Sequence, residues 1–352
     1  MNPATLSALL AQRINTAAPA LIDRGRPISF RELAAESRRL ARGLRQLGVR
    51  AGDCVALWLP NVPAWLASFL ACAQLGAIAV SVNTRFRSHE LADILHRSRA
   101  RVLLFWPGFK GIDFAGILGA CDPQALEHLE SAVIYEEAGA NPPPAMLGKT
   151  VIPYSLLAGC APLLESDAAP DAGCAIFTTS GTTRAPKFVL HDQRTVIRHA
   201  LDVVKAFSVD SEASMLLAPP LCGVFGFCSA MAALAAGRFV FLTRIGDALR
   251  LGGFLASPVE IEAVVQEAPG IAACQVVGVP RGGALAPIAF VVLQHGVNLD
   301  EAAVIAHVAA RLARYKVPLR VFRVDAFPVT PGANATKIQK GKLREMAEAL
   351  LH

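Results

Sequence analysis

The stretch IFTTSGTTRAPK, residues 176–187, joins a short apolar strand pattern to a run of small and hydroxyl residues that ends in Lys187. Small residues let backbone N–H groups approach phosphate oxygens, hydroxyl groups add donors, and a lysine adds positive charge. The stretch does not match G-x-x-x-x-G-K-[ST], which disfavours P-loop phosphoryl transfer. It indicates a phosphate-binding loop, although composition alone leaves a plain Ser/Thr turn as an equal alternative.

The sequence upstream of this stretch alternates between helix and strand patterns. Ser29 and Glu32 have the spacing of a capping box and open a helix predicted over residues 28–47, which Gly48 ends. Further patterns predict a strand within residues 52–61, a helix over 64–75, strands over 77–82 and 99–106, and a surface loop over 138–148. The alternation predicts an α/β fold with a doubly wound, mostly parallel sheet.

The C-terminal part has a different pattern. Helices predicted over residues 258–268 and 300–312, strands over 273–279, 288–293 and 320–324, and a basic terminal helix indicate a small α+β domain. The predicted boundary near residues 244–247 gives a large domain, residues 1–243, and a small domain, residues 244–352. Two domains are expected for 352 residues, because one hydrophobic core rarely grows beyond about 250–300 residues.

The composition excludes several classes of protein. Hydrophobic residues make up 53% of the chain and charged residues 18%, which indicates ordered globular structure. The net charge of +6 comes without a run of like charges, so nucleic acid is not an expected partner. This excess of positive charge could attract an anionic small molecule, and it is equally typical of an ordinary solvated surface. The eight cysteines lack metal-ligand spacing, and we interpret them as buried thiols of a reducing cytoplasm, with no metal-binding residue assigned.

Residues 64–82 form the one segment that approaches membrane-spanning length. Ser68, Gln74 and Gly76 interrupt it, which favours a buried helix that turns into a strand. The first 25 residues are amphipathic and hold no signal-peptide core. These patterns predict a cytoplasmic protein whose contact with membranes is at most peripheral.

Residues 179–187 closely resemble the phosphate-binding loop T-S-G-T-T-G-x-P-K of the adenylate-forming, or AMP-binding, superfamily. The matching residues, with a departure at Arg184 where glycine is common, are Thr179, Ser180, Gly181, Thr182, Thr183, Pro186 and Lys187. Residues 28–86 resemble the family's opening region over nearly their whole length. The resemblance implies an acyl-CoA synthetase that binds phosphate through Thr179, Ser180, Gly181, Thr182, Thr183 and Lys187.

Two downstream segments also resemble this family. PPLCGVFGF, residues 219–227, resembles its acyl-pocket motif and implies pocket residues Cys222, Gly223, Phe225 and Gly226. Gly223 stands where histidine is frequent, which favours a larger or aliphatic acyl group. RIGDALRLGGFLASPVEIE, residues 244–262, resembles the hinge and the start of the mobile C-terminal domain. The implied hinge and CoA-tunnel residues are Arg244, Gly246, Asp247, Arg250, Gly252 and Gly253, although Gly252 and Gly253 also fit a plain turn.

FPVTPGANATKIQKGKLREM, residues 327–346, resembles the family's catalytic-lysine segment, with Lys337 in the place of that lysine. A cation beside a carboxylate that attacks the α-phosphate stabilises the developing charge. Without the resemblance, Lys337 is better read as solvated surface, because other cations surround it.

The family's adenine- and ribose-binding segments are missing from the sequence. A long segment should separate the acyl-pocket motif from the hinge, yet Phe225 and Gly246 are too close for one more βαβ unit. No aromatic-Gly-x-Thr-Glu or Thr-Gly-Asp segment occurs, so the large domain is expected to be incomplete and ATP affinity to fall steeply.

The resemblance implies an ATP-dependent acid:CoA ligase for a fatty or aryl carboxylic acid, with ATP, Mg²⁺ and CoA required. Acyl-adenylate formation would precede thioester formation, and both would be impaired in the shortened chain. The alternative is a non-catalytic remnant that binds a ligand weakly or serves in protein interaction. Homodimer formation and a carrier protein as acceptor stay open.

Overall fold

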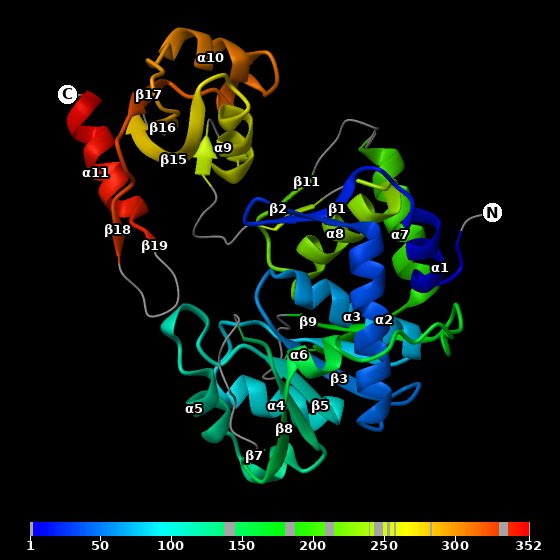
Figure 1. Ribbon diagram of the computed structural model, residues 1–352. Helices are drawn as coiled ribbons and strands as arrows, with labels where there is room; N and C mark the ends of the chain where they lie inside the picture. Colours follow the sequence, from blue (N-terminus) through cyan, green and yellow to red (C-terminus); the bar gives the residue numbers. More distant parts are fainter. Residues whose placement is uncertain are drawn as a thin grey trace. The chain divides into compact units, whose positions relative to one another are not determined.

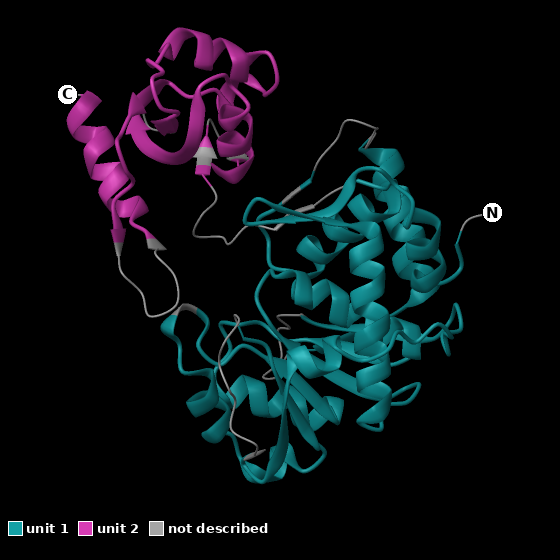
Figure 2. Ribbon diagram, in the orientation of Figure 1, with its two compact units in different colours: residues 1–242 teal, residues 243–352 magenta. Residues whose placement is uncertain are grey.

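The computed structural model describes residues 3–136, 145–179, 187–207, 215–238, 240–242, 249–251, 254–256, 258–281, 284–330 and 337–351. The chain divides into two compact units, residues 1–242 (unit 1) and residues 243–352 (unit 2), which Figure 2 colours separately. Each unit has its own sheet and its own buried core.

The larger sheet of unit 1 has eight strands in the order β10-β9-β4-β3-β5-β6-β8-β7. The six inner strands are parallel, and the two edge strands, β10 and β7, pair antiparallel with their neighbours. Apolar runs such as CVALW and VLLF form inner strands because both faces of a parallel sheet are covered. The bounds are β3 Cys54–Trp58, β4 Ile78–Ser81, β5 Val102–Phe105, β6 Ser131–Ile134, β7 Ala145–Met146, β8 Lys149–Pro153, β9 Gly173–Thr179 and β10 Lys187–Asp192.

Helices cover both faces of this sheet. One face packs against α4 (Ser88–Ser98), α5 (Phe114–Gly119) and the short turns η1 (Phe109–Gly111) and η2 (Pro123–Leu126). The other face packs against the helices that share the main core of unit 1. These helices are α1 (Leu6–Arg13), α2 (Phe30–Gln46), α3 (Pro63–Leu75), α6 (Tyr154–Ala158), α7 (Gln193–Ala206) and α8 (Val224–Ala236).

Helix α3 is the segment that approaches membrane-spanning length in the sequence. It ends at Gly76, whose positive φ of 67° turns the chain into β4. Every α3 residue after Pro63 is buried, because the helix lies between the sheet and α2. The prediction of a buried helix that turns into a strand is therefore confirmed. Within the described ranges, no helix combines the length and hydropathy needed to cross a membrane.

Unit 1 contains a second sheet, which the sequence did not predict. Its order is β11-β12-β1-β2, and β12 lies parallel to both β11 and β1. Helices α2, α3 and α8 lie between the two sheets (Figure 1). The bounds are β1 Pro19–Asp23, β2 Arg26–Ser29, β11 Met215–Leu217 and β12 Val240–Leu242. Strands this short carry too little pattern for period-based prediction.

Unit 2 is a small α+β module, as predicted. Its main sheet runs β14-β13-β16-β15, with β17 paired to β16, and β18 and β19 form a separate ribbon. The strands are β13 Leu249–Leu251, β14 Phe254–Ala256, β15 Ile271–Arg281, β16 Ala284–Leu293, β17 Arg320–Arg323, β18 Val329–Thr330 and β19 Lys337–Ile338. The helices are α9 Pro258–Gln266, α10 Glu301–Ala309 and α11 Lys340–Leu351, with the short turn η3 at Arg314–Lys316.

The predicted surface loop over residues 138–148 is partly wrong. Ala145–Met146 forms β7 and pairs with β8, and Leu147 and Gly148 make the turn between them with φ of 52° and 68°. The rest of that loop, through residue 144, lies largely outside the described residues. Strand β7 has only two residues and forms because it pairs with β8. The high proline and glycine content of this stretch indicates a loop and gives no sign of that pairing.

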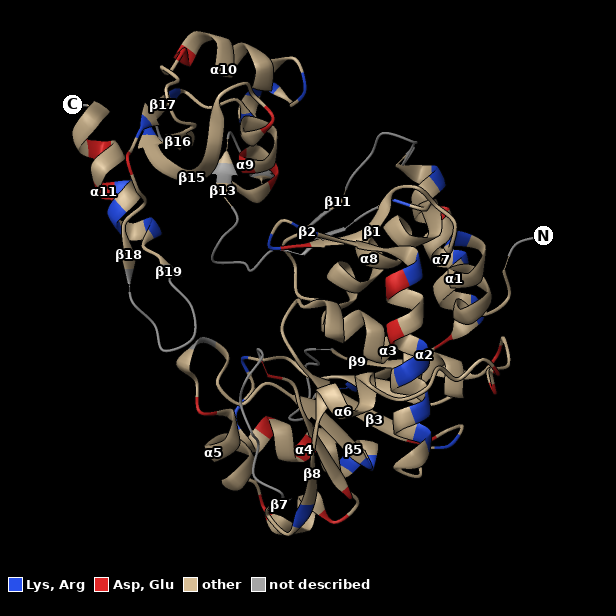
Figure 3. Cartoon of the chain, viewed as in Figure 1, with Lys and Arg blue, Asp and Glu red and all other residues tan. Residues whose placement is uncertain are grey.

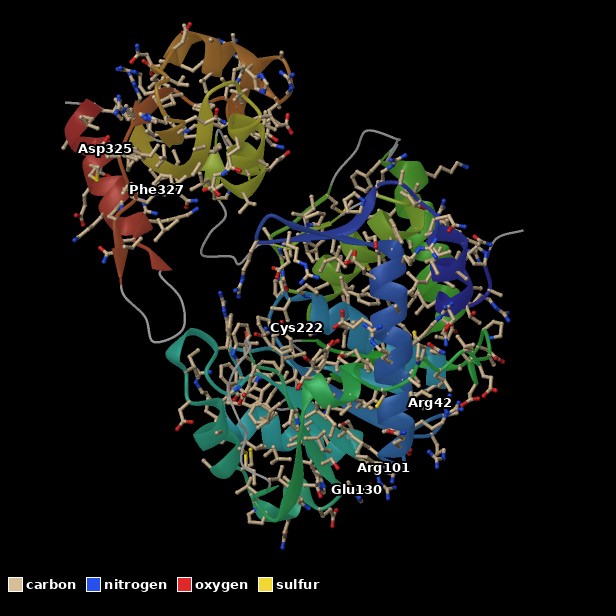
Figure 4. All side chains as sticks on the ribbon, in the orientation of Figure 1. Arg42, Arg101, Glu130, Cys222, Asp325 and Phe327 are labelled. Atoms are coloured by element: carbon tan, nitrogen blue, oxygen red, sulfur yellow. The ribbon has the colours of Figure 1, made fainter. Side chains whose placement is uncertain are left out.

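Charges of both signs are interspersed over both units (Figure 3). Helix α2 carries several arginines, yet Glu32 and Glu36 lie on the same helix. Just before the central strands β5, β3 and β6 begin, Arg101 donates to both Asp53 and Glu130 at 2.7 and 2.8 Å, and Arg101 and Glu130 lie together in Figure 4.

Candidate functional site

The strands β9 and β10 carry the two ends of the predicted phosphate-binding loop. They form an antiparallel pair in which Thr179 stands directly opposite Lys187. Lys187 is exposed, and the next residue, Phe188, packs under the guanidinium of Arg97 at 4.1 Å from its ring centre. The structure thus brings the two ends of the motif together. Ser180, Gly181, Thr182, Thr183 and Pro186 lie outside the described residues, as does the side chain of Thr179.

The acyl-pocket motif forms the entry to α8. Gly223 is the N-cap of this helix, and its N–H donates to the carbonyl of Pro220 at 3.0 Å. Gly226 is buried, and a Cβ there would lie 2.4 Å from the same carbonyl oxygen, so only glycine fits. Phe225 is 76% exposed, and Cys222 is half-buried (Figure 4). Burial raises the pKa of the Cys222 thiol to about 11, which keeps it protonated near neutral pH.

An apolar cavity of about 220 Å³ lies on another face of α8. It is lined by Phe177 of β9, His191 of β10, Thr195, Val196 and His199 of α7, and Val224, Phe227, Cys228 and Met231 of α8. Phe227 anchors its wall, because its ring centre lies 5.0 Å from that of Phe177 and 4.9 Å from that of Phe69. The cavity can receive an apolar body and offers the two histidines as polar groups.

The cavity shares its strands with the phosphate-loop motif. Phe177, which lines the cavity, precedes Thr179 by two residues in β9. Val189 stands opposite Phe177, just as Lys187 stands opposite Thr179. The β9–β10 hairpin therefore contributes both to the wall of the apolar pocket and to the start of the motif.

The sequence did not identify most residues of this cavity. Val224, Phe227, Cys228 and Met231 recur at the spacing of one helix face, a pattern that was available in the sequence. His191, Thr195 and His199 carried no such signal, because they reach the cavity only through the tertiary packing of β10 and α7. Cys222, Gly223, Phe225 and Gly226 flank the cavity in sequence but do not line it.

The predicted catalytic and hinge residues all belong to unit 2. The backbone of Lys337 lies in β19, opposite Thr330 of β18. The backbone of Arg250 lies in β13, opposite Leu255 of β14. The side chains of both residues lie outside the described part, as do Arg244, Gly246, Asp247, Gly252 and Gly253 entirely.

A magnesium site would need carboxylate oxygen donors that lie close together. Within the described ranges, no group of three or more His, Cys, Asp or Glu side chains could hold a metal ion. Octahedral coordination of Mg²⁺ relies on carboxylates, water and substrate phosphates. The described residues do not supply such a set, so we derive no step through this ion.

Two family models match the chain. The model of the AMP-binding enzyme family matches residues 11–264, and the model of the AMP-binding enzyme C-terminal domain matches residues 260–333. Similar curated proteins include the putative acyl-CoA synthetase YngI of Bacillus subtilis (strain 168), 28% identical over 221 residues that cover 58% of this chain and 39% of that protein. The feruloyl-CoA synthase of Amycolatopsis sp is 30% identical over 209 residues, covering 59% and 37%. The chain thus spans under two fifths of the length of these relatives.

Solved structures share the fold. The anthranilate CoA ligase AuaEII in complex with anthranoyl-AMP superposes with a TM-score of 0.58 at 18% identity, covering 99% of this chain and 98% of that one. The Mycobacterium tuberculosis fatty acyl CoA synthetase gives a TM-score of 0.55 at 18% identity, covering 99% of each chain. Because the first family model spans most of the chain, including β9, β10 and α8, this protein belongs to the AMP-binding enzyme family.

Proposed function

We propose that this protein is an acid:CoA ligase in origin and that unit 1 binds a carboxylic acid with a fatty or aryl body. The observation that carries the proposal is the apolar cavity lined in part by the β9–β10 hairpin, at whose end the phosphate-loop motif begins. An engineered apolar cavity of about 150 Å³ holds benzene. A cavity of about 220 Å³ therefore suits one aromatic ring or a short aliphatic chain.

The names of similar proteins support the proposal of an acid:CoA ligase. Their names include an acyl-CoA synthetase, a feruloyl-CoA synthase and a structure with a bound acyl-adenylate. In our proposal, the acid would be activated with ATP at the hairpin end through Thr179, Ser180, Gly181, Thr182, Thr183 and Lys187. Lys337 would stabilise the charge that develops on the α-phosphate. CoA would then accept the acyl group.

The two units would correspond to the two domains of the family. We assign residues 1–243 to a shortened AMP-binding domain and residues 244–352 to the C-terminal domain. In the same proposal, the hinge and the CoA tunnel would be formed by Arg244, Gly246, Asp247, Arg250, Gly252 and Gly253. All eight cysteines are free thiols, which supports a reducing compartment such as the cytoplasm.

A second candidate function rests on the sequence itself. The chain has no aromatic-Gly-x-Thr-Glu segment for adenine and no Thr-Gly-Asp segment for ribose. Each lost hydrogen bond to a charged group weakens binding by about 1.5–3 kcal/mol, so adenylation should be slow. The protein would then act as a binder of carboxylic acids rather than as an efficient ligase.

Two measurements on the purified chain test these proposals. Calorimetric titration with a panel of fatty and aryl acids should show saturable binding, and acids too polar for the cavity should not bind. Pyrophosphate release with ATP, Mg²⁺, CoA and a bound acid should fall below the about 1–1,000 per second of ordinary enzymes. Turnover within that range would exclude the binder hypothesis, and absence of binding by every acid would refute the assignment of the cavity.

A further inference from the structure

Glu262 is a buried carboxylate that joins three elements of unit 2. It lies on α9 and is 7% exposed. Its Oε1 accepts one hydrogen bond from the backbone N–H of Val276 in β15 and another from Nζ of Lys340 in α11, both at 2.8 Å. A single oxygen atom thus connects α9, β15 and α11.

Lys340 directly follows the ribbon that carries Lys337. Lys337 pairs with Thr330, and Ile338 pairs with Val329. The N–H of Gln339 then donates to the carbonyl of Pro328 at 2.8 Å, so the ribbon continues to the residue before Lys340. Because only three peptide bonds separate Lys337 from Lys340, a shift of the first residue of α11 must move β19 as well.

Apolar packing holds α11 against the sheet but does not set its position along the sheet. Leu343 and Ala347 are fully buried, and Ile338 and Phe327 (Figure 4) pack against the same cluster. Apolar attraction depends on buried area and has no direction. A charged hydrogen bond is short and directional, so the Glu262–Lys340 pair can fix the position of α11 along the sheet, which the apolar contacts do not.

Glu262 forms an ion pair with Lys340, with 2.8 Å between Oε1 and Nζ, although the glutamate is almost fully buried. The buried thiol of Cys274 in β15 has a raised pKa, caused first by burial and next by the negative charge of Glu262, while Lys340 acts in the opposite direction. Among the described residues, the cation paired with Glu262 is Lys340. An isolated carboxylate at this depth would be unfavourable without that cation.

We propose that Glu262 is a positioning residue for Lys337. By holding Lys340 at the start of α11, it fixes the register of β19 against β18 and with it the backbone of Lys337. The inference rests on the proposed function for one point, the chemical role of Lys337. It concerns the order of the ribbon, which can be measured without any substrate.

Helix α9 offers a matched control. Glu260 lies two residues before Glu262 and pairs with Nζ of Lys316 at 2.6 Å, with side chains 11% and 16% exposed. Lys316 belongs to η3 rather than to α11. Glu260→Gln therefore removes a half-buried ion pair from the same helix without touching the ribbon.

The experiment is hydrogen–deuterium exchange of the full chain, read by mass spectrometry on peptides that contain Val329, Thr330 and residues 337–339. Glu262→Gln should speed exchange there by about tenfold, which corresponds to about 1.4 kcal/mol. Lys340→Met should do the same, Lys340→Arg should keep protection, and Glu260→Gln should leave these amides unchanged. The thermal midpoint of each variant separates local opening from general destabilisation.

Two results would overturn the proposal. One is equal exchange of the ribbon in Glu262→Gln and Glu260→Gln, and the other is a uniform increase throughout unit 2 in Glu262→Gln. If acid-dependent pyrophosphate release is measurable, Glu262→Gln should lower kcat about tenfold and leave the KM for the acid unchanged. A chain without ATP chemistry would refute the ligase activity and the chemical role of Lys337, yet the exchange pattern would still decide whether Glu262 orders the ribbon.

Discussion

The side-chain oxygen of Asn61 accepts a hydrogen bond from the backbone N–H of Leu221 at 2.8 Å. The amide nitrogen of Asn61 donates to the carbonyls of Leu217 and Pro219 at 3.2 and 3.0 Å. Asn61 follows β3 of the larger sheet, whereas Leu217 ends β11 of the smaller sheet. One side chain therefore joins the two sheets at the segment that leads into α8 and the cavity.

Replacement of Asn61 by alanine should destabilise unit 1 by about 1–3 kcal/mol, because three partly buried backbone groups lose their partner. Urea unfolding followed by circular dichroism measures the change. Asn15→Ala serves as the control, since Asn15 is exposed and its recorded bond is to the side chain of Arg31. A loss no larger than that of the control would show that Asn61 does not stabilise the junction.

Asp192 should contribute acid-sensitive stability to α7, which forms one wall of the cavity. Its carboxylate accepts a hydrogen bond from the N–H of Thr195 at 2.6 Å, and this bond is the first cause of its lowered pKa. A lowered folded pKa gives stability that is complete above the ordinary value of 3.8 and is lost as pH falls further.

Asp192→Ala should therefore cost about 1 kcal/mol at pH 7 through loss of the helix cap. Asp192→Asn keeps a capping oxygen without a titratable charge, so it should match the parent at pH 7 and lose less stability as pH falls below 3.8. Urea midpoints at several pH values measure both effects. Identical acid profiles for the parent and Asp192→Asn would contradict the assignment.

Cys228→Phe should fill the cavity and weaken acid binding by about tenfold or more. Cys228 is a half-buried lining residue, so a larger side chain can enter the cavity space with limited damage to the core. Leu156→Phe is the control, because Leu156 is exposed on α6 and does not line the cavity. Calorimetric titration measures both, and unchanged affinity in Cys228→Phe would place the acid elsewhere.

The thiols of Cys54 and Cys121 should react slowly in the folded chain. Burial raises the pKa of each from 9.0 to about 11, which lowers the reactive thiolate fraction at pH 8 by about a hundredfold. Alkylation by iodoacetamide, followed by mass spectrometry, should thus be far slower than in urea. Since both pKa values are raised, these thiols add stability below pH 9 that is lost as pH rises towards 11. Equal rates in the folded and unfolded chain would contradict this prediction.

Local patterns predicted much of the fold. The capping box of Ser29 and Glu32 is confirmed, with Ser29 Oγ accepting from the Glu32 N–H at 3.1 Å, because a cap depends only on residues three apart. The parallel inner strands are confirmed because both of their faces are buried and their sequences are continuously apolar. The smaller sheet was missed, since β1 and β12 are held by partners distant in sequence.

For the candidate site too, the sequence predicted the local feature and missed the feature that depends on tertiary packing. Thr179 and Lys187 stand opposite each other, as a contiguous motif can predict, because one hairpin contains both. The cavity depends on the packing of β9, β10, α7 and α8, so His191 and His199 could not be identified from their own surroundings in sequence. The role of Lys337 stays a prediction from the resemblance.

The parallel pairing of β1 with β12 constrains how the protein can fold while it is being synthesised. Leu21 leaves the ribosome early, but its partner Val240 follows only after almost all of unit 1 has been made. At about 5–20 residues per second, this delay lasts between about 10 and 45 seconds. During that time the apolar residues Ala20 and Leu21, both fully buried in the finished fold, have no strand to complete their sheet. Nascent chains of this protein should therefore depend on chaperone binding at the N-terminal segment until β12 has emerged.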